Sequence, residues 1–287
     1  MTKSTTDEMN QDAAGSYAPV NGLNMYYEVH GNGRPPVEVP LVLLHGALSA
    51  TGTSFGAVLP SLAKNRQVIA VEQQAHGRTA DIDRSLSTEQ MAEDTAALLR
   101  QLEIESADFF GYSMGAGIAL QVAIRRPDLV RKLVLASAIY NNSGFHPGLL
   151  AGLENLKPED MHGSIFHEEY VRTAPDLEAW LTLVAKVTHL NMHIPDWPAE
   201  AIQSIQAPTL LVIGDSDIVR PEHAVEMFRL LGGGVFGDVA GMPRSRLAVL
   251  PGTTHITVVH RAAWLVSMIE EFLDAPASDS PASEGPA

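Results

Sequence analysis

A serine in a glycine-flanked turn is the clearest chemical feature of this chain. Residues 111–115 read Gly-Tyr-Ser-Met-Gly, so Ser113 has a glycine two positions before it and another two positions after it. The apolar run 107–110 predicts a buried strand, and the Ala- and Ile-rich segment 115–126 predicts a helix. A strand that enters a helix through so tight a turn strains the central residue and exposes its hydroxyl. An idle serine in a glycine-rich turn is the alternative, and the strand–turn–helix context disfavours it.

A serine hydroxyl is a weak nucleophile near neutral pH unless a base takes its proton and an acid orients that base. His255 is the candidate base, because it follows the apolar run 247–250 and should lie in a loop at the carboxyl end of a strand. His260 falls on the predicted final helix, and His223 lies too near the acid-bearing loop to reach Ser113 easily. We therefore expect His255 to be the base.

Asp217 is the candidate acid. The apolar run 209–213 predicts a strand, and Asp217, three residues beyond Gly214, has turned off that strand and can face a cleft. Asp215 is the alternative acid, but its position favours capping of the turn. The three candidates follow the chain order Ser, Asp, His, which is the order that a serine in such a strand–turn–helix unit requires.

Backbone donors for the negative charge of a tetrahedral intermediate are also predicted. The turn that follows the apolar run 41–44 can direct a main-chain N–H at the serine. Together with the N–H of Met114, the N–H of Ala47 would form an oxyanion hole, and Leu48 is the alternative second donor. We expect His45 to brace this turn and not to take part in catalysis.

The segments that must position these residues alternate between strands and helices. Asn21-Gly22 separates two predicted strands and is a strong hairpin signal, while residues 87–90, Ser-Thr-Glu-Gln, predict a capping box that opens a helix. The pattern predicts an α/β fold with a mostly parallel twisted sheet, flanked by helices and carrying an antiparallel edge. Beyond the hairpin, strands are predicted at residues 41–44, 67–71, 107–110, 133–135, 209–213 and 246–250, and a final helix at 258–273.

One interval, residues 140–204, breaks this alternation. It contains no convincing strand, and its apolar residues recur at helical spacings between prolines. Because loops at the carboxyl ends of parallel strands surround the ligand crevice, we expect this interval to be a helical cap over the site. Ordinary packing helices are the alternative. The candidate pocket residues are Leu48, Met161, Phe166, Met192 and Trp197, for most of which core packing is the competing role.

Composition limits the remaining possibilities. The chain has 287 residues, 45% hydrophobic and 18% charged, which suits one large globular domain. Its net charge of −15 disfavours nucleic acid and anionic membrane surfaces as partners. There is no cysteine, so disulfides and thiol chemistry are excluded. With no signal-like segment and no apolar run long enough to span a bilayer, we expect a cytoplasmic protein without a membrane partner.

The chain ends are predicted to be disordered over residues 1–16 and 275–287, because both are polar and small-residue rich. Residues 17–139 and 205–274 then form the core of the fold, on either side of the cap.

No metal or cofactor is expected. His189 and His193 could share a helix face, but two imidazoles without a third ligand are not a metal site. His162 and His167 are five residues apart, which fits a helix face poorly. The sequence has neither a P-loop nor a strand–G-x-G-x-x-G unit with a following acid.

Together these residues resemble the α/β-hydrolase family, at the level of its lidded, single-domain serine esterase-like members. The resemblance covers residues 17–273. It implies that Ser113 is the nucleophile, His255 the general base and Asp217 its partner, and that Ala47 and Met114 are the oxyanion donors.

Residues 72–79 look like the turn that often reads D-x-x-G-x-G-x-S in this family. Here Glu72, Ala75 and Thr79 stand in place of the usual Asp, Gly and Ser.

The resemblance implies a serine hydrolase that cleaves a small-molecule carboxylic ester or lactone through an acyl-enzyme. Thioester hydrolysis, carbon–carbon bond hydrolysis and cofactor-free peroxidation are alternatives on the same fold, which does not choose among them. A ligand-binding module without turnover is a third class, and the intact Ser, Asp and His argue against it.

Overall fold

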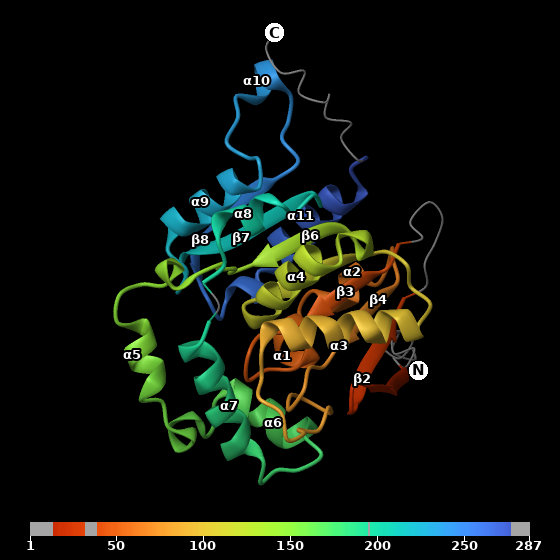
Figure 1. The fold of residues 1–287 in the computed structure, drawn as a ribbon, viewed down its shortest axis with the longest axis vertical. Coiled ribbons are helices and arrows are strands. Elements are labelled where there is room, and N and C mark those ends of the chain that lie inside the picture. Colours follow the sequence, from red (N-terminus) through yellow and green to blue (C-terminus); the bar gives the residue numbers. More distant parts are fainter. Residues whose placement is uncertain (1–13, 32–38, 195, 277–287) are drawn as a thin grey trace, which may run out of the picture.

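An eight-stranded sheet runs through the centre of the molecule (Figure 1), in a computed structural model that describes residues 14–31, 39–194 and 196–276. The strands are β1 Ala14–Val20, β2 Leu23–His30, β3 Leu41–Leu44, β4 Val68–Val71, β5 Ala107–Tyr112, β6 Val130–Ala136, β7 Thr209–Ser216 and β8 Arg246–Thr254. Their spatial order is β1-β2-β4-β3-β5-β6-β7-β8. The pairs β1–β2 and β2–β4 are antiparallel and the other five are parallel. The predicted mostly parallel sheet with an antiparallel edge is confirmed.

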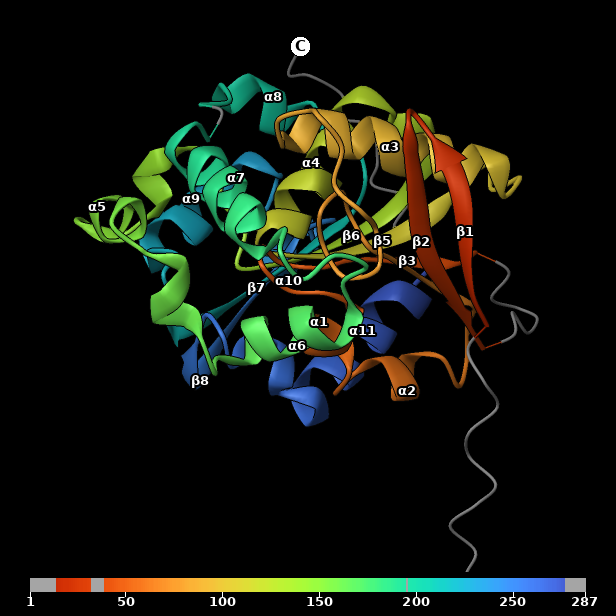
Figure 2. The ribbon, with the colours of Figure 1, turned by 90° about the horizontal axis from the view of Figure 1, so that it is seen from below.

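Helices cover both faces of this sheet (Figure 2). On one face lie α3 Thr88–Gln101 and α4 Met114–Arg125, and on the other lie α1 Thr51–Phe55, α2 Leu59–Leu62 and α11 Ala262–Asp274. Side chains of β3 alternate between the two apolar clusters: Val42 and Leu44 pack with α3 and α4, and Leu41 and Leu43 with α1, α2 and α11. Burial on both faces explains why these central strands are continuous apolar runs.

Residues 140–204, the helical insertion, contain α5 Leu149–Glu154, α6 Ile165–Thr173, α7 Trp180–Met192 and α8 Ala199–Gln203. In the described part of this interval, 140–194 and 196–204, no strand forms, as the sequence predicts. Helices α5, α6 and α7 lie together at one end of the molecule (Figure 1), whereas α8 packs against α4 and against α9, Pro221–Leu230. The described part of the predicted insertion therefore consists of helices joined by loops, and its last helix packs with the core.

Hydrogen bonds hold the insertion against the rest of the fold. The ammonium group of Lys186 on α7 donates to the carboxylate of Asp81 at 2.7 Å and to the carbonyl of Arg84 at 2.9 Å. On α6, the buried Glu169 accepts a bond from the hydroxyl of Thr53 at 2.6 Å. Two helices of the insertion are thus fixed to loops of the sheet domain.

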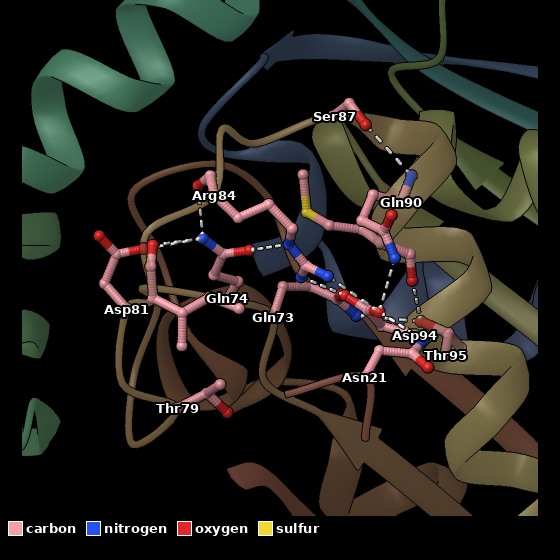
Figure 3. Close-up of polar contacts among 12 residues, drawn as sticks. Asn21, Gln73, Gln74, Thr79, Asp81, Arg84, Ser87, Gln90, Asp94 and Thr95 are labelled. Carbon is pink, nitrogen blue, oxygen red and sulfur yellow. Dashed lines mark hydrogen bonds and ion pairs between the residues drawn. The ribbon is translucent and has the colours of Figure 1, made fainter. Parts of the chain in front are cut away.

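A cluster of polar side chains lies beside α3 and extends to Asp81, the residue that Lys186 bonds (Figure 3). The carboxylate of Asp94, which is fully buried, accepts bonds from Asn21 Nδ2 at 2.8 Å, Gln90 Nε2 at 3.0 Å and Arg84 Nη2 at 2.5 Å. Arg84 also donates to Gln74, whose amide reaches Asp81. The hairpin at residues 21–22, helix α3 and helix α7 are therefore linked by one chain of side chains.

This cluster corrects part of the predicted capping box. Ser87 caps α3 as expected, since its hydroxyl accepts from the N–H of Gln90 at 3.2 Å. The side chain of Gln90 does not return to Ser87 and bonds Asp94 instead. A buried carboxylate gains more from an added donor than an exposed helix terminus does, which explains this choice.

Two predicted boundaries also differ. Strand β1 begins at Ala14, inside the segment expected to be disordered, because residues 14–20 pair in register with β2. The final helix α11 begins at Ala262, after a separate 3-10 turn at Val258–His260. The predictions of disorder for residues 1–13 and 277–287 lie outside the described residues.

Among the residues that the structure does describe, no helix has the length and apolar character needed to cross a membrane.

The turn at residues 72–79 contains Glu72 and Ala75 at positions where the sequence pattern discussed above usually has Asp and Gly. Glu72 is fully buried, and its carboxylate accepts bonds from the N–H of Arg78 at 2.6 Å and from Arg78 Nη1 at 2.9 Å. Burial raises the pKa of Glu72, against the opposing effect of Arg78. Ala75 has a φ of 66°, a left-handed conformation that costs an L-residue stability.

Replacing Ala75 by glycine should stabilise the protein. The Ala75→Gly change removes the left-handed penalty, and we expect the free energy of unfolding to rise by about 0.5–1 kcal/mol. Urea denaturation measures it. The matched control is Ala97→Gly within α3, where the same chemical change should lower the free energy of unfolding by about 1 kcal/mol. A loss of stability in Ala75→Gly would show that the turn is not strained.

Candidate active site

The turn between β5 and α4 holds Ser113 in a strained conformation. Its φ is 54° and its ψ is −116°, and its N–H donates to the carbonyl of Ala136 at 2.9 Å. A Cβ built on Gly111 would lie 2.3 Å from the carbonyl oxygen of Gly115, and one built on Gly115 would lie 1.9 Å from that of Leu44. Side chains cannot exist at such distances, so both glycines are required by the close approach of backbone to backbone.

The structure brings Ser113, His255 and Asp217 into one hydrogen-bonded chain. The Oγ of Ser113 lies 3.0 Å from Nε2 of His255, and Nδ1 of His255 lies 2.8 Å from Oδ1 of Asp217. An ionised carboxylate only accepts, so the imidazole proton lies on Nδ1 and Nε2 is left to accept from the serine. This is the geometry that lets a histidine remove a proton from a serine.

Sheet order explains why three distant segments meet. Ser113 follows β5, Asp217 follows β7, and His255 follows β8. These strands run parallel, in the order β5-β6-β7-β8, so their carboxyl ends lie along one edge of the sheet. Ligand sites of open α/β sheets form at this edge.

The carboxylate of Asp217 is buried and surrounded by donors. Besides His255, it accepts from the hydroxyl of Ser137 at 2.6 Å, the N–H of Gly214 at 3.2 Å and the N–H of Val219 at 3.3 Å. Burial by itself raises the pKa of Asp217, but the bond and charge of His255, with the bonds from Ser137 and Gly214, outweigh it and lower that pKa. The group is therefore ionised at neutral pH.

Asp215 has a different position from its neighbour. It is exposed, and its carboxylate accepts from the N–H of Gly252 at 2.9 Å and the N–H of Thr253 at 3.1 Å. These backbone bonds lower its pKa. Capping of its own turn was the expected role; Asp215 instead mainly holds the neighbouring segment that leads to His255, because β7 and β8 are adjacent.

Tyr112 and Ser137 support the site and were missed by the sequence analysis. The buried Tyr112 donates its hydroxyl proton to the carbonyl of His255 at 2.9 Å, and its ring centroid lies 5.3 Å from that of the imidazole. Burial raises the pKa of Tyr112, so its hydroxyl remains a donor. Tyr112 could have been suspected as the second residue of the serine pentapeptide. Ser137 has no sequence signal beyond its place after a predicted strand.

The predicted oxyanion donors lie beside Ser113. Ala47 and Met114 both line the cavity described below, and Met114 is the first residue of α4, where N–H groups lack partners within the helix. Leu48, the alternative donor, has a φ of 58°. His45 braces this turn as expected: Nδ1 bonds the carbonyl of Gly46 at 2.8 Å, and Nε2 accepts from the N–H of Gln73 at 3.0 Å. Burial lowers the pKa of His45 to about 4, which keeps it neutral.

A cavity of about 210 Å³ opens next to the serine. The predicted pocket residues Leu48, Phe166 and Trp197 line it. Two further predictions were wrong: Met161 is buried in the apolar core, and Met192 lines a separate surface groove with His189. The residues of the cavity are Gly46, Ala47, Leu48, Thr88, Tyr112, Ser113, Met114, Gly117, Ser137, Ile139, Phe145, Leu153, Leu156, Phe166, Val187, Thr188, Leu190, Asn191, Ile194, Trp197, Ile218 and His255.

Helical geometry explains the misplaced methionine on α7. On α7, Val187, Leu190 and Asn191 line the cavity, Val184, Ala185, His189 and Met192 line the groove, and Thr188 lines both. Met192 stands four residues after Thr188 and three after His189, so its side chain belongs to the face of the helix that lines the groove.

The other histidines have structural surroundings. His223 stacks on Tyr140, with ring centroids 4.6 Å apart, and accepts the N–H of Tyr140. His189 on α7 stacks at 4.1 Å on His193, the residue that directly follows this helix. Within residues 14–31, 39–194 and 196–276, no three His, Cys, Asp or Glu side chains are grouped so that they could hold a metal ion.

A family model that describes the α/β hydrolase fold matches residues 39–160, which include the serine turn and both predicted oxyanion donors. The chain has the α/β hydrolase fold that this model describes. It is 26% identical over 278 residues to the uncharacterized hydrolase YugF of Bacillus subtilis, covering 88% of this chain and 96% of that protein.

Two further likenesses are to proteins named as hydrolases. Over 101 residues the chain is 41% identical to a 2-hydroxymuconate semialdehyde hydrolase of a Pseudomonas strain, covering 33% of this chain and 35% of that protein. The fold is similar to that of the meta-cleavage product hydrolase CumD of Pseudomonas fluorescens, with a TM-score of 0.69, 19% identity, and coverage of 91% of this chain and 98% of that one. At that identity the structural likeness shows the fold alone.

Substitution of the two aspartates should separate their roles. Asp217→Asn offers the imidazole an amide that can favour the wrong tautomer, so we expect kcat to fall by roughly 10⁴-fold. Asp215→Asn keeps one acceptor for the loop and should cost less than about tenfold. Steady-state hydrolysis of a p-nitrophenyl ester measures both. The opposite ranking would make Asp215 the acid.

Proposed function

We propose that this α/β hydrolase is a serine hydrolase that cleaves an uncharged carboxylic ester or lactone through an acyl-enzyme. The observation that carries the proposal is the continuous chain of hydrogen bonds from Ser113 through His255 to Asp217, which opens into an apolar cavity. Each member has a role in it: Ser113 is the nucleophile, His255 the general base and Asp217 the group that orients and stabilises the imidazolium.

The reaction follows from this arrangement. As Ser113 Oγ bonds to the substrate carbonyl carbon, Nε2 of His255 accepts the hydroxyl proton, and the carbonyl oxygen becomes an oxyanion. The N–H groups of Ala47 and Met114 stabilise that oxyanion, each by about 3 kcal/mol of barrier. His255 then protonates the departing alcohol, which leaves an acyl-enzyme. Water, deprotonated by His255, attacks the acyl carbon, and the acid product leaves as Ser113 recovers its proton.

The cavity lining favours an uncharged substrate. Among its described residues none is Lys, Arg, Asp or Glu, and the polar side chains apart from His255 and Ser113 are Thr88, Tyr112, Ser137, Thr188 and Asn191. A carboxylate buried there would lack a cationic partner, at a cost of several kcal/mol. Carbon–carbon bond hydrolysis is the second candidate, because a relative is named a 2-hydroxymuconate semialdehyde hydrolase. A muconate carries a carboxylate, and this lining supports the ester or lactone over it.

The helical insertion acts as the cap in this proposal. Leu153, Leu156 and Phe166 contribute to the lining, and so do five residues of or directly after α7. The cap therefore supplies most of the apolar surface that an acyl or alcohol group would contact, while the core supplies the reacting groups. Thioester hydrolysis and peroxidation would use the same triad, and no contact in the cavity favours them.

The nucleophile can be tested directly. Ser113→Ala should reduce the hydrolysis of p-nitrophenyl esters by roughly 10⁴-fold or more, because the proposed acyl-enzyme forms on the hydroxyl that this change removes. It should also abolish covalent labelling by a fluorophosphonate, read by mass spectrometry. Ser245→Ala is the matched control, since Ser245 is a buried serine that bonds the carbonyl of Leu231. Labelling that persisted in Ser113→Ala would place the chemistry on another residue.

The preference for an uncharged acyl group can be tested with two esters of equal chain length. We expect kcat/KM for p-nitrophenyl hexanoate to exceed that for mono-p-nitrophenyl adipate by about 100-fold, because the second buries an unpaired carboxylate. Asn191→Lys should narrow this ratio by adding a cation to the lining. His189→Lys, outside the cavity lining on the same helix, should not. Equal rates for the two esters in the wild-type enzyme would contradict an uncharged pocket.

A further inference from the structure

Ser137 occupies the position directly after β6, between the serine turn and the aspartate loop. It is 3% exposed, and its N–H donates to the carbonyl of Val212 on β7 at 2.8 Å. Because β6 lies between β5 and β7 in the sheet, this residue is flanked by the strand that precedes Ser113 and the strand that precedes Asp217.

The hydroxyl of Ser137 makes one of the shortest contacts of the site. It donates to Oδ2 of Asp217 at 2.6 Å, while His255 takes Oδ1 of the same carboxylate at 2.8 Å. The other donor to Oδ2 is the N–H of Gly214, at 3.2 Å. Among the described residues, Ser137 and His255 are the two side chains that hydrogen-bond this carboxylate. Ser137 bonds Oδ2 and His255 bonds Oδ1. Because both oxygens are held, rotation of the carboxylate about its Cβ–Cγ bond would break these bonds.

The backbone of Ser137 indicates that the hydroxyl is needed there. Its φ is 55°, in the left-handed region, where a glycine would fit without cost and a side chain is strained. Strain of this kind persists where the surrounding structure and the function require it. The nucleophile Ser113, at the end of the adjacent strand β5, has nearly the same φ of 54°.

We propose that Ser137 is a positioning residue for the reaction. It acts through Asp217: by holding Oδ2, it keeps Oδ1 directed at Nδ1 of His255, so that Nε2 stays aligned with Ser113. The inference rests on the proposed serine-hydrolase function and adds a fourth side chain to its chain of hydrogen bonds.

The strained backbone makes a sharp test available. Ser137→Gly removes the hydroxyl and the strain together, so its melting temperature should exceed that of Ser137→Ala, which loses the same hydrogen bond and keeps the strain. Its kcat for p-nitrophenyl hexanoate should nevertheless fall about tenfold, with KM unchanged, as expected for the loss of one hydrogen bond to a charged group. The rate of labelling by a fluorophosphonate should fall by the same factor.

Two further variants are controls for Ser137→Gly. Ser137→Ala loses the hydroxyl and keeps the strain, so it should match Ser137→Gly in kcat and be less stable. Ser245→Ala loses a buried serine hydroxyl elsewhere and should keep the wild-type kcat. The proton NMR signal of the His255 Nδ1–H, seen at low field when it bonds a carboxylate, should move or broaden in both Ser137 variants and not in Ser245→Ala.

The outcomes separate this inference from the proposed function. If the wild-type enzyme hydrolyses esters and is labelled at Ser113, but Ser137→Gly keeps its kcat and its His255 signal, the positioning role is wrong and the function stands. A rise in KM with unchanged kcat and labelling would also overturn it, because Ser137 would then act by contacting substrate in the cavity. A wild-type protein that neither hydrolyses esters nor takes the label would overturn both.

Discussion

A buried carboxylate is stable only where donors surround it, and the site of this protein is organised around one such group. Asp217 receives bonds from Ser137 after β6, from Gly214 within β7, from Val219 in the loop after β7, and from His255 after β8. The bonds from Ser137 and His255 depend on the register of neighbouring parallel strands. Any slip of that register would leave an ionised group buried without partners, at a cost of several kcal/mol. Because Asp217 needs these donors, the site can form only when the strands of the sheet pair in the correct register.

A second constraint acts on the backbone around the nucleophile. Helix α4 begins directly after Ser113, and its backbone at Gly115 lies against the carbonyl of Leu44 on β3. This close approach requires glycine, because a Cβ at position 115 would overlap that carbonyl oxygen. Close packing at this point places Ser113 and Met114 in the lining of the same cavity. Tyr112, one residue earlier, anchors the loop of His255 through a hydroxyl bond. Three consecutive residues thus support the proposed nucleophile, oxyanion donor and base, so small movements of this turn would affect all three.

The cavity depends on how firmly the helical insertion is held. Lys186 lies on α7, next to Val187 in the cavity lining, and its bonds to the loop of Asp81 and Arg84 join that helix to the core. Arg84 in turn bonds the buried Asp94 on α3. Partly buried ion pairs with several backbone acceptors give more geometric definition than exposed pairs do. This linkage supports the view that the apolar roof of the cavity has a defined position relative to the reacting groups.

The sequence by itself determined the local parts of this protein. Glycines on both sides of Ser113 and continuous apolar runs such as residues 41–44 depend on steric and burial rules that act within a few residues, so the turn and the strand order along the chain could be predicted. The chain order of Ser113, Asp217 and His255 also restricted the candidate triad, because strands of one parallel sheet end at one edge. The fold class could be predicted for the same reason.

Only the tertiary structure decided which side chains meet. Ser137 carries no local signal, and its bond to Asp217 exists because β6 and β7 are neighbours in the sheet although 80 positions separate the two residues. Met192 was expected in the pocket and lies outside it, because the rotation of a helix about its axis is fixed by what it packs against. Spacing along a chain determines what one segment can form, whereas contacts between segments depend on the packing of all of them together.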